Sequence, residues 1–169
     1  MCAVVAAATL PLAGCTTLVA GSAAAPPPSA PPAGLQADVL PDECLLTPAE
    51  LADLVDLPVA ALEQGTVERA DGSRSGGCTA RAGSEPVALV NVYGVRSGSP
   101  ADYVRAGESA GRRELAGVGE AAVVIGTAAG PALQLAGPRH LVTILVSGRA
   151  PSDDEWRAAA EAALARLPG

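Results

Sequence analysis

Residues 87–95 read VALVNVYGV, a run in which only Asn91 and Gly94 are neither aliphatic nor aromatic. Residues 141–146 read LVTILV and share this character. β-Branched and aromatic residues favour strands, and a strand with few polar positions is typical of the middle of a sheet, where both faces are covered. The two runs therefore predict central β-strands.

Shorter runs of similar composition predict four further strands. They span residues 65–70, 78–81, 121–125 and 132–136. Pairs such as Asp71-Gly72 and Gly137-Pro138, which favour turns, separate them from their neighbours. The sequence therefore predicts six strands in two groups of three.

Three helix starts share one signature, a hydroxyl residue followed three positions later by a carboxylate. They are Thr47-Pro48-Ala49-Glu50, Ser99-Pro100-Ala101-Asp102 and Ser152-Asp153-Asp154-Glu155. The hydroxyl caps the first turn, the carboxylate favours the same end, and proline is tolerated at the first helical position. Helices are predicted near residues 48–56, 100–110 and 152–166.

The last predicted helix has an apolar stripe. Trp156, Ala160, Ala163 and Leu167 are spaced four, three and four residues apart, which places them on one side of a helix. We expect this side to face the sheet.

The order of predicted elements is α-β-β-β-α-β-β-β-α. It indicates an α+β domain, with a mainly antiparallel sheet and helices packed on it. The helix caps Thr47, Ser99 and Ser152 recur at intervals of 52 and 53 residues. This regular spacing leaves two interpretations open, an internal duplication and a coincidence.

Residues 12–15, Leu12-Ala13-Gly14-Cys15, match a lipobox, the site at which a lipoprotein signal is cleaved and the cysteine acylated. Residues 3–12 form an apolar stretch too short to span a bilayer but long enough for a signal peptide. We therefore expect a signal peptide over residues 1–14 and a lipid on Cys15; the alternative is a chance match in an alanine-rich tail. The basic residues that normally open such a signal are missing, since Arg69 is the first Lys or Arg, so we expect the true start to lie upstream.

Residues 15–37 are rich in Pro, Ala, Ser and Gly, a composition that favours an extended linker over a packed structure. Residues 38–169 are long enough for a single globular domain. Cys44 and Cys78 are the cysteines in this domain, and such a pair outside the cytoplasm predicts a disulfide. A free thiol pair and a redox or metal role are the alternatives, although a metal site needs more ligands than two cysteines and one distant histidine.

The domain has few residues suited to catalysis. His140 is the only histidine, so any catalytic scheme based on histidine would have to use it. Asp153, Asp154 and Glu155 could bind a cation, but their position at a helix start favours a capping role. Asp42 and Glu43 likewise precede the first helix, and the same capping interpretation applies to them. Neither a metal nor another cofactor is expected.

The net charge of −7 argues against nucleic acid as a partner. Arg112 and Arg113 are the only adjacent basic residues, so a phosphate-binding cluster is missing. Tyr93 and Tyr103 could line a ligand site, although partly buried core positions explain them equally well.

A family resemblance lies in the segment that follows the lipobox and the Pro-rich linker, which reads Cys44-Leu45-Leu46-Thr47-Pro48-Ala49-Glu50-Leu51. Together with a second cysteine before a Val-rich strand and a closing helix, it resembles the actinobacterial lipoproteins that share domain of unknown function 3558. The resemblance spans residues 40–167. It implies a lipid-anchored α+β domain with a disulfide, and it implies no catalytic residue.

We therefore expect a non-enzymatic lipoprotein on the extracytoplasmic face of the cell membrane. Its expected partner is an envelope protein or a small apolar ligand, bound between the sheet and the helices. One rival is an envelope hydrolase that uses His140 with an acidic partner. Another is a purely structural or accessory role.

Overall fold

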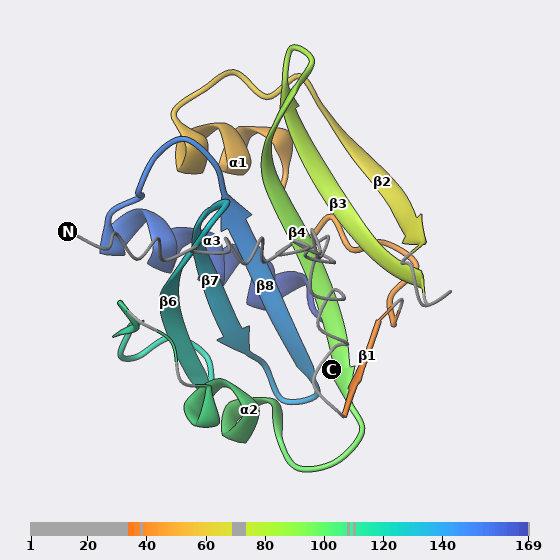
Figure 1. Cartoon of the computed structure of the whole chain (residues 1–169), viewed down its shortest axis with the longest axis vertical. Helices are drawn as coiled ribbons and strands as arrows, with labels where there is room; N and C mark the ends of the chain where they lie inside the picture. The colour runs from red at the N-terminus through yellow and green to blue at the C-terminus, as the bar shows by residue number, and fades with distance from the viewer. Residues whose placement is uncertain (1–33, 38, 69–73, 108, 110, 169) are drawn as a thin grey trace, which may run out of the picture.

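The computed structural model describes residues 34–37, 39–68, 74–107, 109 and 111–168, which form three helices and one antiparallel sheet (Figure 1). The predicted lipobox with Cys15, the signal peptide and residues 15–33 of the linker lie outside the described residues. Leu35–Gln36, at the end of the segment predicted as linker, form the short strand β1.

The sheet has eight strands in the order β2-β3-β4-β8-β7-β6-β5, and β1 pairs with the end of β4. The longer strands are β2 (Ala61–Glu68), β3 (Arg74–Ala82), β4 (Glu85–Val95), β6 (Ala121–Thr127), β7 (Gly130–Ala136) and β8 (His140–Val146), and β5 (Arg113–Glu114) is short. The helices are α1 (Pro48–Val55), α2 (Pro100–Ala106) and α3 (Asp153–Arg166). The predicted order of helices and longer strands is therefore confirmed, and β1 and β5 are two-residue additions to it.

β4 and β8 pair at the centre of the sheet, as the two apolar runs predicted. Asn91 lies opposite Thr143 in the middle of their ladder. These residues are 52 positions apart, the interval that also separates the caps of α1 and α2. The triplets β2-β3-β4 and β6-β7-β8 thus meet at the central pair, β4 and β8, and are related by an approximate two-fold arrangement. The helices do not follow this arrangement, because α1 and α2 pack in different core clusters.

The main core lies between the sheet and the pair α1 and α3, which lie together behind the sheet in Figure 1. Leu51 and Leu54 of α1 and Trp156 of α3 are at most 2% exposed and pack in one cluster with Val90 and Ile144 of the central strands. The predicted stripe of α3 is confirmed, since Ala160 and Ala163 are fully buried in the same cluster.

The opposite face of the sheet carries the smaller helix α2. Ala101 and Val104 of this helix form a second cluster with Val123 of β6 and Leu141 of β8. Thr143 and Leu145 alternate with Leu141 toward this face and are only half-buried. The coverage predicted for both faces of the central strands is therefore only partial on the α2 face.

Several predicted boundaries differ from the observed ones because backbone pairing and capping override local composition. β3 begins four residues before the predicted run. β2 begins at Ala61, four residues before the predicted start, and lies at the exposed edge of the sheet, while residues 69–70 of that prediction and the turn predicted at Asp71-Gly72 lie outside the described residues. α2 ends at Ala106, short of residue 110. The Arg112 guanidinium donates to the carbonyls of Val104 and Gly107, both at 2.8 Å, and so satisfies the end of that helix.

The predicted Cys44–Cys78 disulfide is confirmed, with Cα atoms 5.0 Å apart. It joins the segment before α1 to β3, where Cys78 is fully buried. The neighbouring Glu43 is also buried, and its carboxylate accepts a hydrogen bond from the backbone N–H of Val92 at 3.4 Å. β3 pairs with β4 up to Val90 and β1 begins to pair at Gly94, so Glu43 occupies the gap between them.

Within the described residues, no helix is both long enough and apolar enough to cross a membrane.

Candidate functional site

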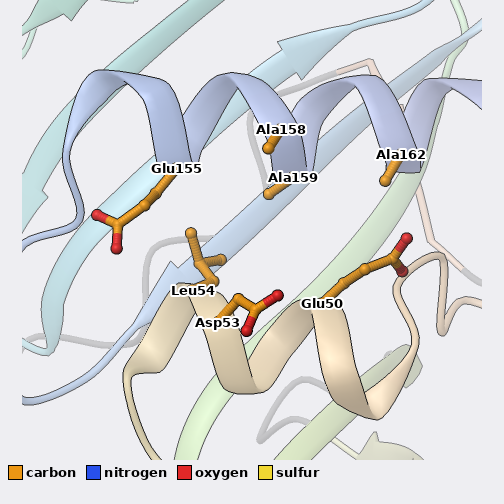
Figure 2. A pocket seen from close by; sticks show the side chains of 7 residues that line it. All are labelled: Glu50, Asp53, Leu54, Glu155, Ala158, Ala159 and Ala162. Atoms are coloured by element: carbon orange, nitrogen blue, oxygen red, sulfur yellow. The ribbon is translucent and has the colours of Figure 1, made fainter.

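A groove runs between α1 and α3 (Figure 2). Its hollow has a volume of about 240 Å³. Leu54 of α1 points toward α3, where Ala158, Ala159 and Ala162 present only methyl groups (Figure 2). Because small residues face a large apolar one across the helix pair, the groove has an apolar floor that opens to solvent.

One end of the groove is braced by Glu50 and Arg166, which join the start of α1 to the end of α3. The guanidinium Nη2 lies 2.9 Å from Glu50 Oε1, and Nη1 donates to the carbonyls of Leu45 at 2.9 Å and Ala162 at 3.2 Å. The hydrogen bond from Arg166, with those from Thr47, lowers the pKa of the Glu50 carboxyl against the opposing effect of partial burial. Glu50 therefore stays ionised as both helix cap and brace.

The other end is braced by Glu155 and Arg149. Arg149 Nη2 contacts both carboxylate oxygens of Glu155 at 2.8 Å, and its Nη1 lies 3.5 Å from the carbonyl of Asp53 in α1. The backbone N–H of Ser152 donates to Glu155 at 2.6 Å. The pKa of Glu155 is lowered to about 2, mainly by this hydrogen bond and to a lesser extent by the one from Arg149.

Beyond Glu155 the groove continues into a more open hollow around the end of α1. Asp53 and Glu155 line both parts, and Asp56, Leu57 and Pro58 line the second part. Among the residues that the structure describes, Leu57 is the only large hydrophobic side chain that is exposed, at 45%. Asp53 and Asp56 form no ion pair with another described residue, in contrast to Glu50 and Glu155.

The backbone at Asp56 is unusual for this residue type. Asp56 ends α1 with φ 55° and ψ 39°, the left-handed conformation that glycine adopts most easily. Aspartate tolerates this region better than most residues with a side chain, but less well than glycine. The conformation turns the chain so that Leu57 follows directly beside the groove.

The two glutamates of the groove have pKa values that do not favour a role as general acids. A carboxylic general acid needs a raised pKa, whereas the pKa values of both Glu50 and Glu155 are lowered. The described residues that line the apolar hollow include no Ser, His or Cys. In the described part of the chain, no three His, Cys, Asp or Glu residues are grouped as a metal site would require.

His140 lies in a different hollow, of about 490 Å³, at the end of β4 and the start of β8. Burial first, and the charge of Arg139 second, lower the pKa of His140 and favour its neutral form. Ser99 also lines this hollow, but its hydroxyl accepts the N–H of Asp102 as the cap of α2, at 3.0 Å. Among the described residues that line this hollow there is no acidic side chain of the kind that a His140 hydrolase would require.

The acidic run at the start of α3 is occupied by capping and ion pairs. Asp153 contacts Arg113, Asp154 lies 3.1 Å from Arg157, and Glu155 binds Arg149. These contacts agree with the capping interpretation of that run.

Arg112 and Arg113 are not grouped as a phosphate site, because Arg112 caps α2 and Arg113 pairs with Asp153. Tyr93 and Tyr103 are half-buried against the α2 cluster. Burial, and secondarily Tyr93, raise the pKa of Tyr103. The tyrosines thus occupy the partly buried core positions that were one of their two interpretations.

The groove between α1 and α3 was not predicted from the sequence. The space between the sheet and the helices, where we expected a ligand, holds the side chains of the main core. The one sign of a groove in the sequence was the group of alanines at 158–160 and 162–163, which leaves little side-chain volume on α3. Only the docking of α1 shows that some of these alanines line a hollow.

Comparisons with known proteins found no protein family, curated protein or solved structure that matches this chain.

Proposed function

We propose that this protein is a non-enzymatic lipoprotein, anchored through Cys15 on the extracytoplasmic face of the cell membrane, whose domain binds a partner in the groove between α1 and α3. The observation that carries the binding role is the open apolar floor of this groove between two carboxylates that are each braced by an arginine. An accessible apolar surface beside fixed charges is typical of a recognition site.

The disulfide supports the proposed location. Cys44 and Cys78 form a bond that persists in oxidising compartments outside the cytoplasm and is rare inside it. The lipobox and the resemblance to actinobacterial lipoproteins agree with this location. Two acyl chains on Cys15 would hold the protein stably at the membrane, while a single chain would not.

The anchor is tested by metabolic labelling with a palmitate analogue in a host that processes lipoproteins. Wild-type protein should be labelled and cleaved before Cys15, whereas Cys15→Ala should be neither labelled nor cleaved. Cys2→Ala is the matched control, because it removes a thiol from the same segment and should leave labelling unchanged. Labelling that persists in Cys15→Ala would refute the anchor.

The binding site is tested by site-specific photo-crosslinking in the same cells. A photoreactive residue replaces the exposed Ala158 in the groove and, as control, the exposed Ala128 at the turn between β6 and β7. A defined adduct should form at position 158 and not at position 128. Adducts of equal yield at both positions would show that the groove is not a preferred binding site.

A further inference from the structure

We infer that the groove between α1 and α3 takes a short cationic amphipathic segment of a partner protein, with an apolar side chain on the alanine floor and basic side chains beside Asp53 and Asp56. This inference rests on the binding role proposed above and names the chemistry of the partner.

Volume argues for a side chain and against a whole small ligand. Sites for small molecules have volumes of roughly 300–1000 Å³ and enclose most of the ligand, whereas the apolar hollow has only about 240 Å³ and the hollow of about 580 Å³ that continues from it is more open still. The hollow therefore suits a side chain that enters from an element lying across it. α1 has eight residues and a length of about 12 Å, so the groove matches about two turns of a helix.

Charge determines which segment fits. Four carboxylates line the two connected hollows, those of Glu50, Asp53, Asp56 and Glu155. Arg166 and Arg149 neutralise the two glutamates and thereby hold the helices together. The two aspartates form no ion pair with another described residue, and they lie on the same side of the groove as the exposed Leu57.

The complementary surface combines positive charge with apolar contact. A basic side chain on the partner would approach Asp53 or Asp56, while its apolar face would cover Leu57 and the alanine floor. A helix with apolar residues at intervals of three or four and basic residues beside them presents this combination. An acidic segment would meet the uncompensated aspartates and be repelled.

The test uses the full chain carrying Cys15→Ala, so that no acyl group is attached, and synthetic amphipathic helices as probes. One probe contains Leu and Lys, and two others have Gln or Glu in place of every Lys. Binding is measured by fluorescence anisotropy of the labelled peptides. The Leu/Lys probe should bind most tightly, the Leu/Gln probe more weakly and the Leu/Glu probe weakest, and the preference should decrease as salt is added.

Two variants assign the binding to the groove. Asp53→Asn with Asp56→Asn removes both charges, and asparagine tolerates the left-handed backbone at position 56. Affinity for the Leu/Lys probe should fall by about five- to tenfold, as expected for two partly exposed ion pairs. The matched control, Glu114→Gln with Glu120→Gln, changes the net charge equally at exposed positions outside the groove, and should alter affinity by less than about twofold.

Ala158→Leu fills the hollow from an exposed helical position and should also weaken binding of the Leu/Lys probe. Far-UV circular dichroism checks that each variant is folded. If the Leu/Gln probe binds as tightly as the Leu/Lys probe and Ala158→Leu weakens both, the groove binds a partner but the inferred cationic character is wrong. If none of the groove variants changes binding of the Leu/Lys probe, both the inference and the proposed binding site are wrong.

Discussion

Reduction of the Cys44–Cys78 bond should lower the free energy of unfolding by about 3–4 kcal/mol. The bond closes a loop of 34 positions, for which the chain-entropy relation gives about 3.8 kcal/mol at 25 °C. In a domain of this length, a loss of one kcal/mol lowers the melting temperature by roughly 3–5 °C. The melting temperature should therefore fall by roughly 10–18 °C when the bond is reduced.

Fluorescence of Trp156 provides the assay, because it is the only tryptophan and its side chain is fully buried in the core. Thermal unfolding is followed with and without a phosphine reductant, after equilibration in urea and refolding so that the reductant reaches the buried Cys78. The variant Cys44→Ala with Cys78→Ala is the control and should not respond to the reductant. The reasoning is refuted if the wild-type melting temperature stays the same while peptide mass spectrometry finds alkylated Cys44 and Cys78 before reduction.

Three further changes test other features of the fold. The pKa of Glu155 is about 2 in the folded state against an ordinary value near 4.5, so the stability due to its ionised form is present at neutral pH and is lost as the pH falls between these values. In urea unfolding, the difference in stability between wild type and Glu155→Gln should therefore shrink from pH 6 to about pH 2.5. A difference that stays constant would contradict the proposed brace. Asp56→Gly should raise the free energy of unfolding by about 0.5–1 kcal/mol in urea, because glycine adopts the left-handed backbone without strain, and a decrease would show that the aspartate side chain stabilises the turn. Leu135→Ala should cost about 2–5 kcal/mol because Leu135 is fully buried, whereas Leu57→Ala should change stability by less than about 0.5 kcal/mol, and similar losses for both would contradict the observed burial.

The fold could largely be predicted because its local signals agree with its packing. Thr47, Ser99 and Ser152 cap the three helices as their spacing indicated, since a cap depends on residues within one turn. The run at 87–95 lies in a central strand because its apolar side chains need cover on two faces. β2 was placed less well, because as an exposed edge strand it has few apolar positions, and its extent depends on pairing with β3.

The candidate site could not be predicted in the same way. In the sequence, Asp53 looks like an ordinary polar residue within a helix and Asp56 like one at its end. Nothing in the neighbouring residues marks either of them as part of a binding site. Their proximity to Glu155 depends on how α1 docks against α3, about a hundred residues later in the chain. Glu43 likewise read as a residue before a helix start, yet it is buried against Val92 because β3 and β1 leave a gap along β4.

Local sequence was enough to predict the helix starts, the central strands, the element order and the pairing of Cys44 with Cys78. These features depend on contacts within a turn, on the periodicity of apolar residues, or on there being one cysteine pair in the domain. The packing of α1 and α2 in different clusters, and the groove between α1 and α3, became visible only in the folded domain. Such features depend on side chains that are distant in sequence and meet only after the helices dock. The lipobox at Cys15 remains a prediction from local sequence, whereas the groove is a site that only the folded chain possesses.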